Sequence, residues 1–349
     1  MARASTSKPA HGIDPTPLRE ACRREVAQGL RACQVAVGFG EEVVYSESFG
    51  AARDETRFWV ASATKPIVAS AIWILIGEKR LEVERRVADY IPGFGSHGKT
   101  DITLEQVLLM TSGFPDAVMP REEGVDASRR AQRFAEWDLR HRPGQEYHYH
   151  PGSAHWVLAD LIERASGQDF RDFVEERLTR PLGLPRVLGI ERAQQQDIAQ
   201  LWATDGETQG EQRHDHAAKI EVGEPGGGGA MRARDLARFY QGLLHDSAGL
   251  FDPAVLLDAT THIRTTLPDP WMKLPANRTL GVVVGPGFGS TWGSSQTAFG
   301  WNGIGGQIGF AEPATGVSFC FLQHGDDDAT RPFVRGARMS KLALELGGA

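Results

Sequence analysis

A serine and a lysine, Ser62 and Lys65, are spaced so that they could carry out acyl transfer together. They stand at the start of an apolar run, 66–77, that is typical of a helix, and residues three apart on a helix share one face. A serine hydroxyl needs a base to become a good nucleophile, and a partly desolvated lysine can lose its proton near neutral pH and act as that base. The same spacing is also compatible with a helix-capping serine and a solvated lysine, so the pair needs further support.

The segment before this pair would place the serine at a helix N-terminus. The apolar run 58–61 is typical of a short strand that leads directly to Ser62. Backbone N–H groups and the positive end of the helix dipole would then favour the anionic groups that form during acyl transfer.

A loop with two tyrosines could supply a further proton-transfer group. Tyr147 and Tyr149 end an extended, aromatic-rich segment that begins at a Pro143-Gly144 turn, and an amphipathic helix follows it. A tyrosine at the end of such a loop can project into a cleft instead of a core.

A glycine-rich segment near the C-terminus could form one side of the same cleft. Residues 299–306 are predicted as a strand that turns through 312–316 into a second strand, 317–323. Gly303, Gly305 and Gly306 keep one edge of the first strand free of side chains, so that a substrate could approach the backbone closely.

In this order, the three blocks resemble the serine beta-lactamase-like superfamily, in particular the group of class C beta-lactamases, family VIII carboxylesterases and D-aminopeptidases. The Ser-x-x-Lys motif matches Ser62 and Lys65. The second motif, usually Tyr-x-Asn, matches at Tyr149, where the spacing from the Pro-Gly turn fits better than at Tyr147, and Pro151 stands where Asn is usual. The segments 102–113 and 225–240 are also similar, so the resemblance runs from about residue 35 to 323.

The third motif, Lys-Thr-Gly or His-x-Gly, corresponds to Trp301, Asn302 and Gly303. The resemblance implies an α+β fold in which helices flank an antiparallel sheet and an all-helical lobe is inserted. We therefore expect a disordered leader at 1–15, an α/β domain formed by 16–80 and 217–349, and an inserted helical domain at 81–216.

The resemblance also implies a mechanism. Ser62 would attack an ester or amide carbonyl and form an acyl-enzyme, while Lys65 and Tyr149 share the proton transfers, with either of them as the free base. The Lys65 ammonium would favour a Tyr149 phenolate. The oxyanion hole would be the backbone N–H groups of Ser62 and Ile304. The expected substrate contacts are Trp301, Asn302, Gly303, His150 and Pro151.

Two departures from the family motifs concern the substrate. Trp301 carries no charge for a substrate carboxylate, and Pro151 lacks the side-chain amide that would orient an acyl group. We therefore expect a carboxylesterase acting on small or medium neutral acyl esters, with the Trp301 indole as one wall of the pocket. The alternatives are an acyltransferase or amide-forming enzyme of secondary metabolism, a D-peptidase or amide hydrolase, a weak β-lactamase and, least favoured, a non-catalytic binding protein.

The composition agrees with a cytoplasmic enzyme. The net charge of −7 over 349 residues is spread without a basic stripe, which argues against nucleic acid as a partner. The longest apolar run, 66–77, is shorter than the roughly 20 residues that span a bilayer, and the N-terminus lacks an apolar signal segment. Three cysteines without metal-ligand spacing indicate idle thiols. We expect a small-molecule ester or amide substrate, no cofactor, no metal and no membrane partner, and the sequence does not indicate an oligomeric state.

The remaining pattern predicts the elements that would hold the site. The expected helices are 17–31, 233–244 and 331–346, and the expected strands are a hairpin over 34–50 around Gly40-Glu41, then 280–284, 297–303 or beyond, and 317–323. The glycines at 226–229 are interpreted as a plain loop, because no phosphate-loop Lys-Ser/Thr follows them.

Overall fold

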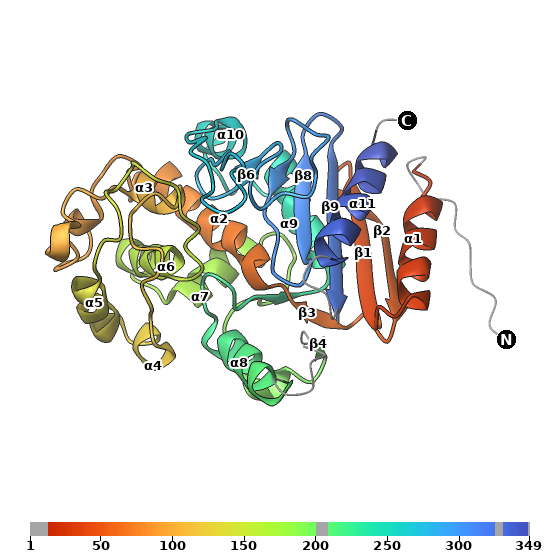
Figure 1. The fold of residues 1–349 in the computed structure, drawn as a ribbon, viewed down its shortest axis with the longest axis horizontal. Coiled ribbons are helices and arrows are strands. Elements are labelled where there is room, and N and C mark those ends of the chain that lie inside the picture. The colour runs from red at the N-terminus through yellow and green to blue at the C-terminus, as the bar shows by residue number, and fades with distance from the viewer. Residues whose placement is uncertain (1–12, 200–208, 325–330, 348–349) are drawn as a thin grey trace.

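The computed structural model describes residues 13–199, 209–324 and 331–347. Strands from both ends of the chain form one antiparallel sheet with the order β2-β1-β9-β8-β7-β6. Their bounds are β1 Ala32–Phe39, β2 Glu42–Gly50, β6 Val283–Val284, β7 Phe299–Gly300, β8 Ile308–Glu312 and β9 Val317–His324. The sheet lies on one side of the molecule and most helices from the middle of the chain lie on the other (Figure 1).

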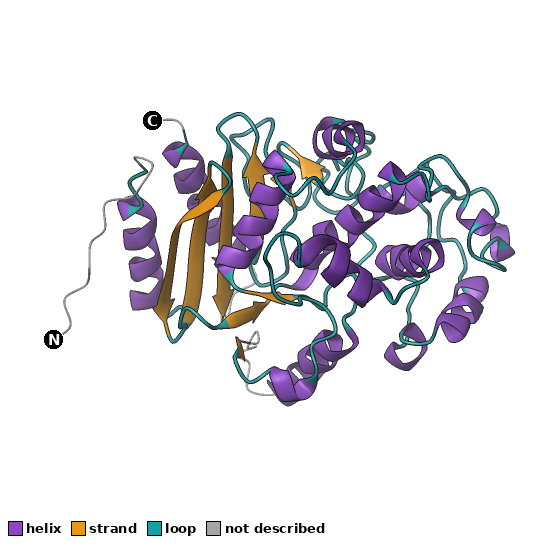
Figure 2. Ribbon diagram, turned by 180° about the vertical axis from the view of Figure 1, so that it is seen from behind, coloured by secondary structure: helices purple, strands orange, loops and turns teal. Residues whose placement is uncertain are grey.

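The β1–β2 hairpin at the edge of this sheet is formed as the sequence predicts. Gly40 and Glu41 occupy the turn with φ of 58° and 74°, the left-handed conformation that a tight hairpin turn requires. Seven of the eight residues of β1 and all of β9 are buried, because helices cover both faces of the sheet. The helix α9 (Ala233–His245) packs on one face, and α1 (Thr16–Ala27) and α11 (Arg331–Leu346) pack on the other (Figures 1 and 2).

A small second sheet connects the large sheet to the helices. Its central strand, β3 (Arg57–Trp59), pairs with β4 (Ile198–Ala199) and β5 (Ala230–Met231). The chain leaves β3 through a 3-10 helix, Ala61–Thr64, and continues as α2 (Lys65–Gly77). The first eleven residues of α2, up to Leu75, are buried, since this helix is apolar on all sides and runs between the sheet and the other helices (Figure 1).

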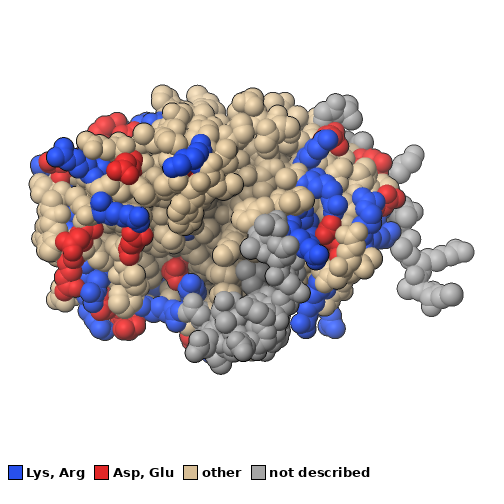
Figure 3. Space-filling view, in the orientation of Figure 1, with Lys and Arg blue, Asp and Glu red and all other residues tan. Residues whose placement is uncertain are grey.

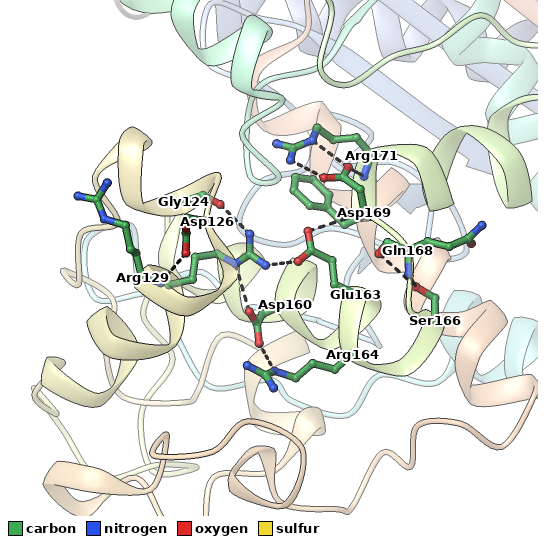
Figure 4. Close-up of polar contacts among 12 residues, drawn as sticks. Gly124, Asp126, Arg129, Asp160, Glu163, Arg164, Ser166, Gln168, Asp169 and Arg171 are labelled. Atoms are coloured by element: carbon green, nitrogen blue, oxygen red, sulfur yellow. Dashed lines mark hydrogen bonds and ion pairs between the residues drawn. The ribbon is translucent and has the colours of Figure 1, made fainter.

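Three of the other helices, α6 (Ser153–Ser166), α7 (Phe170–Val174) and α10 (Pro253–Thr261), pack against α2, and the rest lie further out. The rest are α3 (Leu104–Leu108), α4 (Arg121–Gly124), α5 (Ala127–Glu136) and α8 (Gln209–Val222). A polar network joins α5 to α6, because the buried Arg130 guanidinium donates to the Gly124 carbonyl at 2.7 Å and to the Asp160 carboxylate at 3.2 Å, and it also pairs with Glu163 (Figure 4).

The sheet with flanking helices confirms the predicted α+β class, whereas the division into two domains at residues 80 and 216 stays a prediction. Acidic and basic side chains are intermixed at the two ends of the face in Figure 3, and the middle of that face is largely uncharged. Among the described residues, no helix combines the length and apolar character needed to cross a bilayer. Cys22, Cys33 and Cys320 are buried free thiols.

The prediction for the glycine-rich segment was wrong in detail. The strand expected at 297–303 or beyond is only β7, which ends at Gly300, and a separate strand, β8, follows. Between them the chain turns, with the Gly303 N–H donating to the Gln307 carbonyl at 2.7 Å. Gly305 and Gly306 have φ of 77° and 78°. Residues in this left-handed conformation interrupt a strand, so the glycines form a turn instead of an open edge.

Other boundaries also differ from the predictions. The strand expected at 280–284 is restricted to β6, since Gly281 makes a tight turn with φ of 113°. The segment around 147–149 is a loop and not a strand, and α10 was not predicted. Residues 1–12 of the expected leader lie outside the described residues, whereas Ile13 is buried in the core.

Candidate active site

Ser62 lies in the 3-10 helix that joins β3 to α2, and its side chain is half-buried. The local turn is held by Thr64, whose hydroxyl donates to the Ala61 carbonyl at 2.6 Å and accepts the Gly229 N–H at 3.0 Å. The glycine loop at 226–229 therefore packs directly against the serine segment. A side chain at Gly229 would meet the Thr64 hydroxyl at 2.7 Å, so this close approach requires glycine.

Lys65 is fully buried one turn further along the chain. Its Nζ donates to Ser62 Oγ at 3.1 Å, to the Pro151 carbonyl at 2.9 Å and to the Gly226 carbonyl at 2.6 Å. An ammonium has three protons, so each of them has an acceptor. The lysine is thereby fixed in one position beside the serine.

Tyr149 completes the cluster from a distant part of the chain. Its phenol oxygen lies 2.6 Å from Ser62 Oγ, and either atom can be the donor. Lys65 Nζ lies 5.1 Å from the centre of the Tyr149 ring. The structure therefore brings Ser62, Lys65 and Tyr149 together within hydrogen-bond reach of one oxygen, Ser62 Oγ.

Tyr147, the other tyrosine of the loop, points elsewhere. It is buried with Met110 and Ala276, and its hydroxyl has no hydrogen bond of good geometry to a described residue, although it lies near the Arg278 guanidinium. Burial raises the pKa of the Tyr147 phenol, although the nearby positive charge of Arg278 acts in the opposite direction.

The third motif approaches the serine through its glycine. A Cβ at Gly303 would come within 2.3 Å of the Val60 carbonyl oxygen, so only glycine fits this contact between the turn and the chain before Ser62. Ile304, the next residue, is 67 % exposed. Within the described part of the chain, the backbone N–H groups of Ser62 and Ile304 donate no hydrogen bond.

Trp301 occupies a different place from the one expected. Its side chain is 2 % exposed and its indole stacks on the Tyr149 ring, with centroids 5.6 Å apart and an interplanar angle of 26°. A Cβ at Gly289 would meet the indole at 2.4 Å, so the loop containing Gly289 covers it. In this structure Trp301 supports Tyr149 from behind and does not line an open wall.

His150 also lies inside the protein. It is fully buried, its Nδ1 lies 2.6 Å from the His148 carbonyl, and its Nε2 lies 3.1 Å from the Ser112 hydroxyl. Because a carbonyl can only accept, Nδ1 carries the proton and Nε2 accepts from Ser112. Burial lowers the pKa of His150 to about 3, so the ring is neutral. As placed, His150 holds the Tyr149 loop and cannot contact a substrate, contrary to our expectation.

The remaining expected contacts act through the backbone or lie beside the site. The Pro151 ring is exposed while its carbonyl holds Lys65. The Asn302 side-chain amide donates to the Thr291 hydroxyl at 3.3 Å.

Sequence reasoning missed three neighbours of the cluster. The Gly226 carbonyl accepts a hydrogen bond from Lys65, and the run of glycines at 226–229 was the feature of the sequence that could have indicated such a close backbone contact. His155 on α6 is completely buried, and neither ring nitrogen has a partner among the described residues. Burial, followed by the charges of Lys65 and Arg278, holds the pKa of His155 far below its usual value. Arg278 is fully buried over Trp301, and no motif pointed to it.

Comparisons with known proteins show which family and fold the chain shares. The family model described as Beta-lactamase matches residues 18–343. Esterase EstB of Burkholderia gladioli is 27 % identical over 92 % of this chain and 94 % of its own length. The esterase/beta-lactamase LipL of Mycobacterium tuberculosis is 26 % identical over 76 % of this chain and 68 % of its own length. A penicillin-binding protein homologue from Caulobacter crescentus has a similar fold, with a TM-score of 0.82, 24 % identity and coverage of 96 % of this chain and 99 % of its own.

Proposed function

Since the chain belongs to the beta-lactamase family, we propose that it is a serine hydrolase that forms an acyl-enzyme on Ser62 and prefers neutral esters of small or medium acyl groups. The family match confirms the resemblance that the three motifs indicate. The observation that carries the proposal is the position of Ser62 Oγ, 2.6 Å from the Tyr149 phenol and 3.1 Å from Lys65 Nζ. A nucleophile within reach of two proton-transfer groups is the arrangement that acyl transfer needs.

The proposed reaction has two halves. In the first, the Tyr149–Lys65 pair takes the proton of Ser62 Oγ, the oxygen bonds to the ester carbonyl carbon, and Tyr149 returns the proton to the departing alcohol oxygen. In the second, water attacks the acyl-enzyme and gives a proton to the pair, the bond to Ser62 Oγ breaks, and Oγ regains its proton. The carboxylic acid is then released.

The negative charge on the carbonyl oxygen needs hydrogen-bond donors in both halves. We assign this role to the backbone N–H groups of Ser62 and Ile304. Two features support the assignment: neither group has an acceptor among the described residues, and Gly303 lets the turn pack against the serine segment. Loss of one such donor typically costs about 3–4 kcal/mol of transition-state stabilisation.

The charges near the serine support a neutral substrate. In the motif segments 62–65, 149–151 and 301–303, the cation is Lys65, and its three protons are already engaged. A substrate carboxylate would find no free cation in these segments, whereas a neutral ester needs none. The printed names of the two relatives, an esterase and an esterase/beta-lactamase, support ester hydrolysis in the same way.

A comparison of two chromogenic substrates tests the proposal. We expect kcat/KM for p-nitrophenyl butyrate to exceed that for nitrocefin by at least about 10²-fold. The nitrocefin carboxylate would lack an ion contact worth about 1–3 kcal/mol, and its unpaired charge would also have to be desolvated. Ser62→Ala should lose ester turnover, whereas the control Ser96→Ala, at an exposed serine far from Lys65, should keep it.

The outcomes separate the parts of the proposal. Undiminished ester hydrolysis by Ser62→Ala would exclude Ser62 as the nucleophile. A preference for nitrocefin would leave the serine mechanism intact and refute the neutral-ester specificity. Product analysis with an added alcohol or amine shows whether water or another nucleophile accepts the acyl group.

A further inference from the structure

An arginine is buried behind the candidate active site without a counter-ion. Arg278 is fully buried, and in the described part of the chain it forms no ion pair. Its one side-chain hydrogen bond of good geometry is a long one, from Nη2 to the Gly281 carbonyl at 3.4 Å, and its Nε and Nη1 have no well-placed acceptor among the described residues. The Tyr147 phenol lies close enough to act on the guanidinium as a weak hydrogen-bond partner, but it carries no charge to pair with it. A buried charge of this kind is costly to the fold, so its presence calls for a functional explanation.

Arg278 reaches the proton-transfer groups through a stack of rings. Its guanidinium carbon lies 4.5 Å from the centre of the Trp301 indole, which in turn stacks on Tyr149 at 5.6 Å. Tyr149 therefore has one cation, Lys65, at 5.1 Å and a second cation behind its stacking partner. Cations over aromatic faces are favourable contacts, so the stack also fixes the orientation of Trp301.

The other groups around Arg278 are arranged so that its charge is not cancelled. The charge of Arg278 acts on His150 and His155, and both rings are neutral near pH 7, because burial lowers the pKa of His150 to about 3 and holds that of His155 well below its usual value. Burial lowers the pKa of Arg278, whereas negative charge on the phenols of Tyr147 and Tyr149 and the contact with the Tyr147 hydroxyl act in the opposite direction.

One carboxylate acts on this cluster: the charge of Asp269 acts to raise the pKa of Tyr147, and its side chain accepts the backbone N–H groups of Trp271 and Met272. It is engaged with its own loop and forms no ion pair with Arg278 among the described contacts. The titratable groups named around Tyr149 are therefore two cations, two neutral histidines, a second phenol and the Asp269 carboxylate, which forms no ion pair with Arg278.

We propose that Arg278 is a positioning residue of the proton-transfer unit: its fixed charge, held behind Trp301, stabilises the state in which the Tyr149–Lys65 pair has given up a proton. This inference rests on the proposed function. The direction of the effect is the same whichever member of the pair is the free base, because a nearby positive charge favours both a phenolate over a phenol and a neutral amine over an ammonium. Arg278 thereby extends the range of pH over which Ser62 can be activated toward the acid side.

The size of the effect follows from the stack. The two separations, 4.5 and 5.6 Å, place the guanidinium at most about 10 Å from the centre of the Tyr149 ring. At this distance and an effective dielectric constant of about 20, a unit charge changes a proton equilibrium by about one pH unit.

Three variants test the proposal. Arg278→Met and Arg278→Gln remove the charge, and the glutamine can keep a donor near the Gly281 carbonyl, so that one neutral variant remains if the other fails to fold. Arg278→Lys keeps the charge. The control is Arg264→Met in the same part of the chain, because Arg264 pairs with Glu105 and Asp258 and lies outside the stack.

The first readout is the pH profile of kcat/KM for p-nitrophenyl butyrate. We expect the midpoint of its acid limb to move up by about one pH unit in the neutral variants, to return most of the way in Arg278→Lys, and to stay in place in Arg264→Met. A residue that only supported the fold would lower activity or melting temperature without moving this midpoint. An unchanged midpoint in a folded neutral variant overturns the proposal.

The second readout does not depend on turnover. Near-ultraviolet titration follows tyrosinate formation, and the Tyr149 signal is the component that disappears in Tyr149→Phe. We expect this component to titrate at higher pH in the neutral variants, and no shift would overturn the proposal. If the unaltered chain hydrolyses no ester, the proposed function fails, while this titration still decides whether Arg278 acts on Tyr149.

Discussion

Tyr147 and Tyr149 offer a matched pair of substitutions two residues apart on one loop. Each change to phenylalanine removes a single hydroxyl and leaves the ring. The Tyr149 hydroxyl lies 2.6 Å from Ser62 Oγ, whereas the Tyr147 hydroxyl is buried and has no hydrogen bond of good geometry among the described residues. The two variants should therefore differ sharply although the chemistry of the substitution is identical.

The magnitudes follow from these contacts. Tyr149→Phe removes one hydrogen bond, which is worth about 1 kcal/mol of stability, but as a proton-transfer group its loss should lower kcat/KM by about 10²–10⁴, equivalent to roughly 3–5 kcal/mol at the transition state. A stability loss of about 1 kcal/mol cannot by itself unfold enough of the protein to produce a loss of that size. Tyr147→Phe removes a buried hydroxyl that has no well-formed hydrogen bond and only a weak contact with Arg278, so it should leave kcat/KM nearly unchanged and change the free energy of unfolding by no more than about 1–3 kcal/mol.

Both quantities are measurable on the same samples. Initial rates with p-nitrophenyl butyrate give kcat/KM, and urea denaturation followed by circular dichroism gives the free energy of unfolding. The reasoning is refuted if Tyr147→Phe abolishes turnover while Tyr149→Phe is nearly silent, because the wrong tyrosine would then have been placed in the mechanism.

Three further changes test other parts of the site. Lys65→Ala should also lower kcat/KM by about 10²–10⁴. The double variant with Tyr149→Phe should lose much less activity than the product of the two single losses, because the two residues act as one unit. Fully multiplicative losses would show that they act separately. Trp301→Lys should destabilise the protein by about 3–5 kcal/mol without creating nitrocefin hydrolysis, because the new cation would be buried beside Arg278; a stable variant that gains β-lactam hydrolysis would contradict the buried position of the indole. The free energy of unfolding should fall as the pH drops from about 6.5 toward 3, since His150 takes up a proton in the unfolded chain but stays neutral when it is buried. In His150→Gln the melting temperature should fall less steeply over this pH range. An unchanged slope would exclude His150 as a cause of the pH dependence.

Local patterns predicted the elements that carry the motifs. The hairpin of β1 and β2, the helix α9 and the C-terminal helix α11 follow from strong periodicity and clear turn signals. Ser62 and Lys65 stand at a strand–helix junction, and the resemblance to the family motifs singled them out; Tyr149 was chosen over Tyr147 because its spacing from the Pro-Gly turn fits the second motif of that family. Their meeting at one oxygen depends on tertiary packing.

What the sequence could not reveal are properties of the packed interior. The pattern around Gly303 to Gly306 fits both an open strand and a turn, and the turn forms because two glycines adopt positive φ. His150 and Trp301 were expected at the surface of the cleft, yet neighbouring segments cover both. Arg278 belongs to no motif, since its position over the Trp301 indole depends on how the two segments pack against each other.

The most direct test of the account is to trap the acyl-enzyme. The protein is treated with a fluorophosphonate or a slowly hydrolysed ester, digested and analysed by mass spectrometry, with Ser62→Ala as the parallel sample. The account predicts one modified peptide that carries the label on Ser62 and no active-site label in the variant. A label on any other serine, or equal labelling of the variant, would contradict the central claim that Ser62 is the nucleophile.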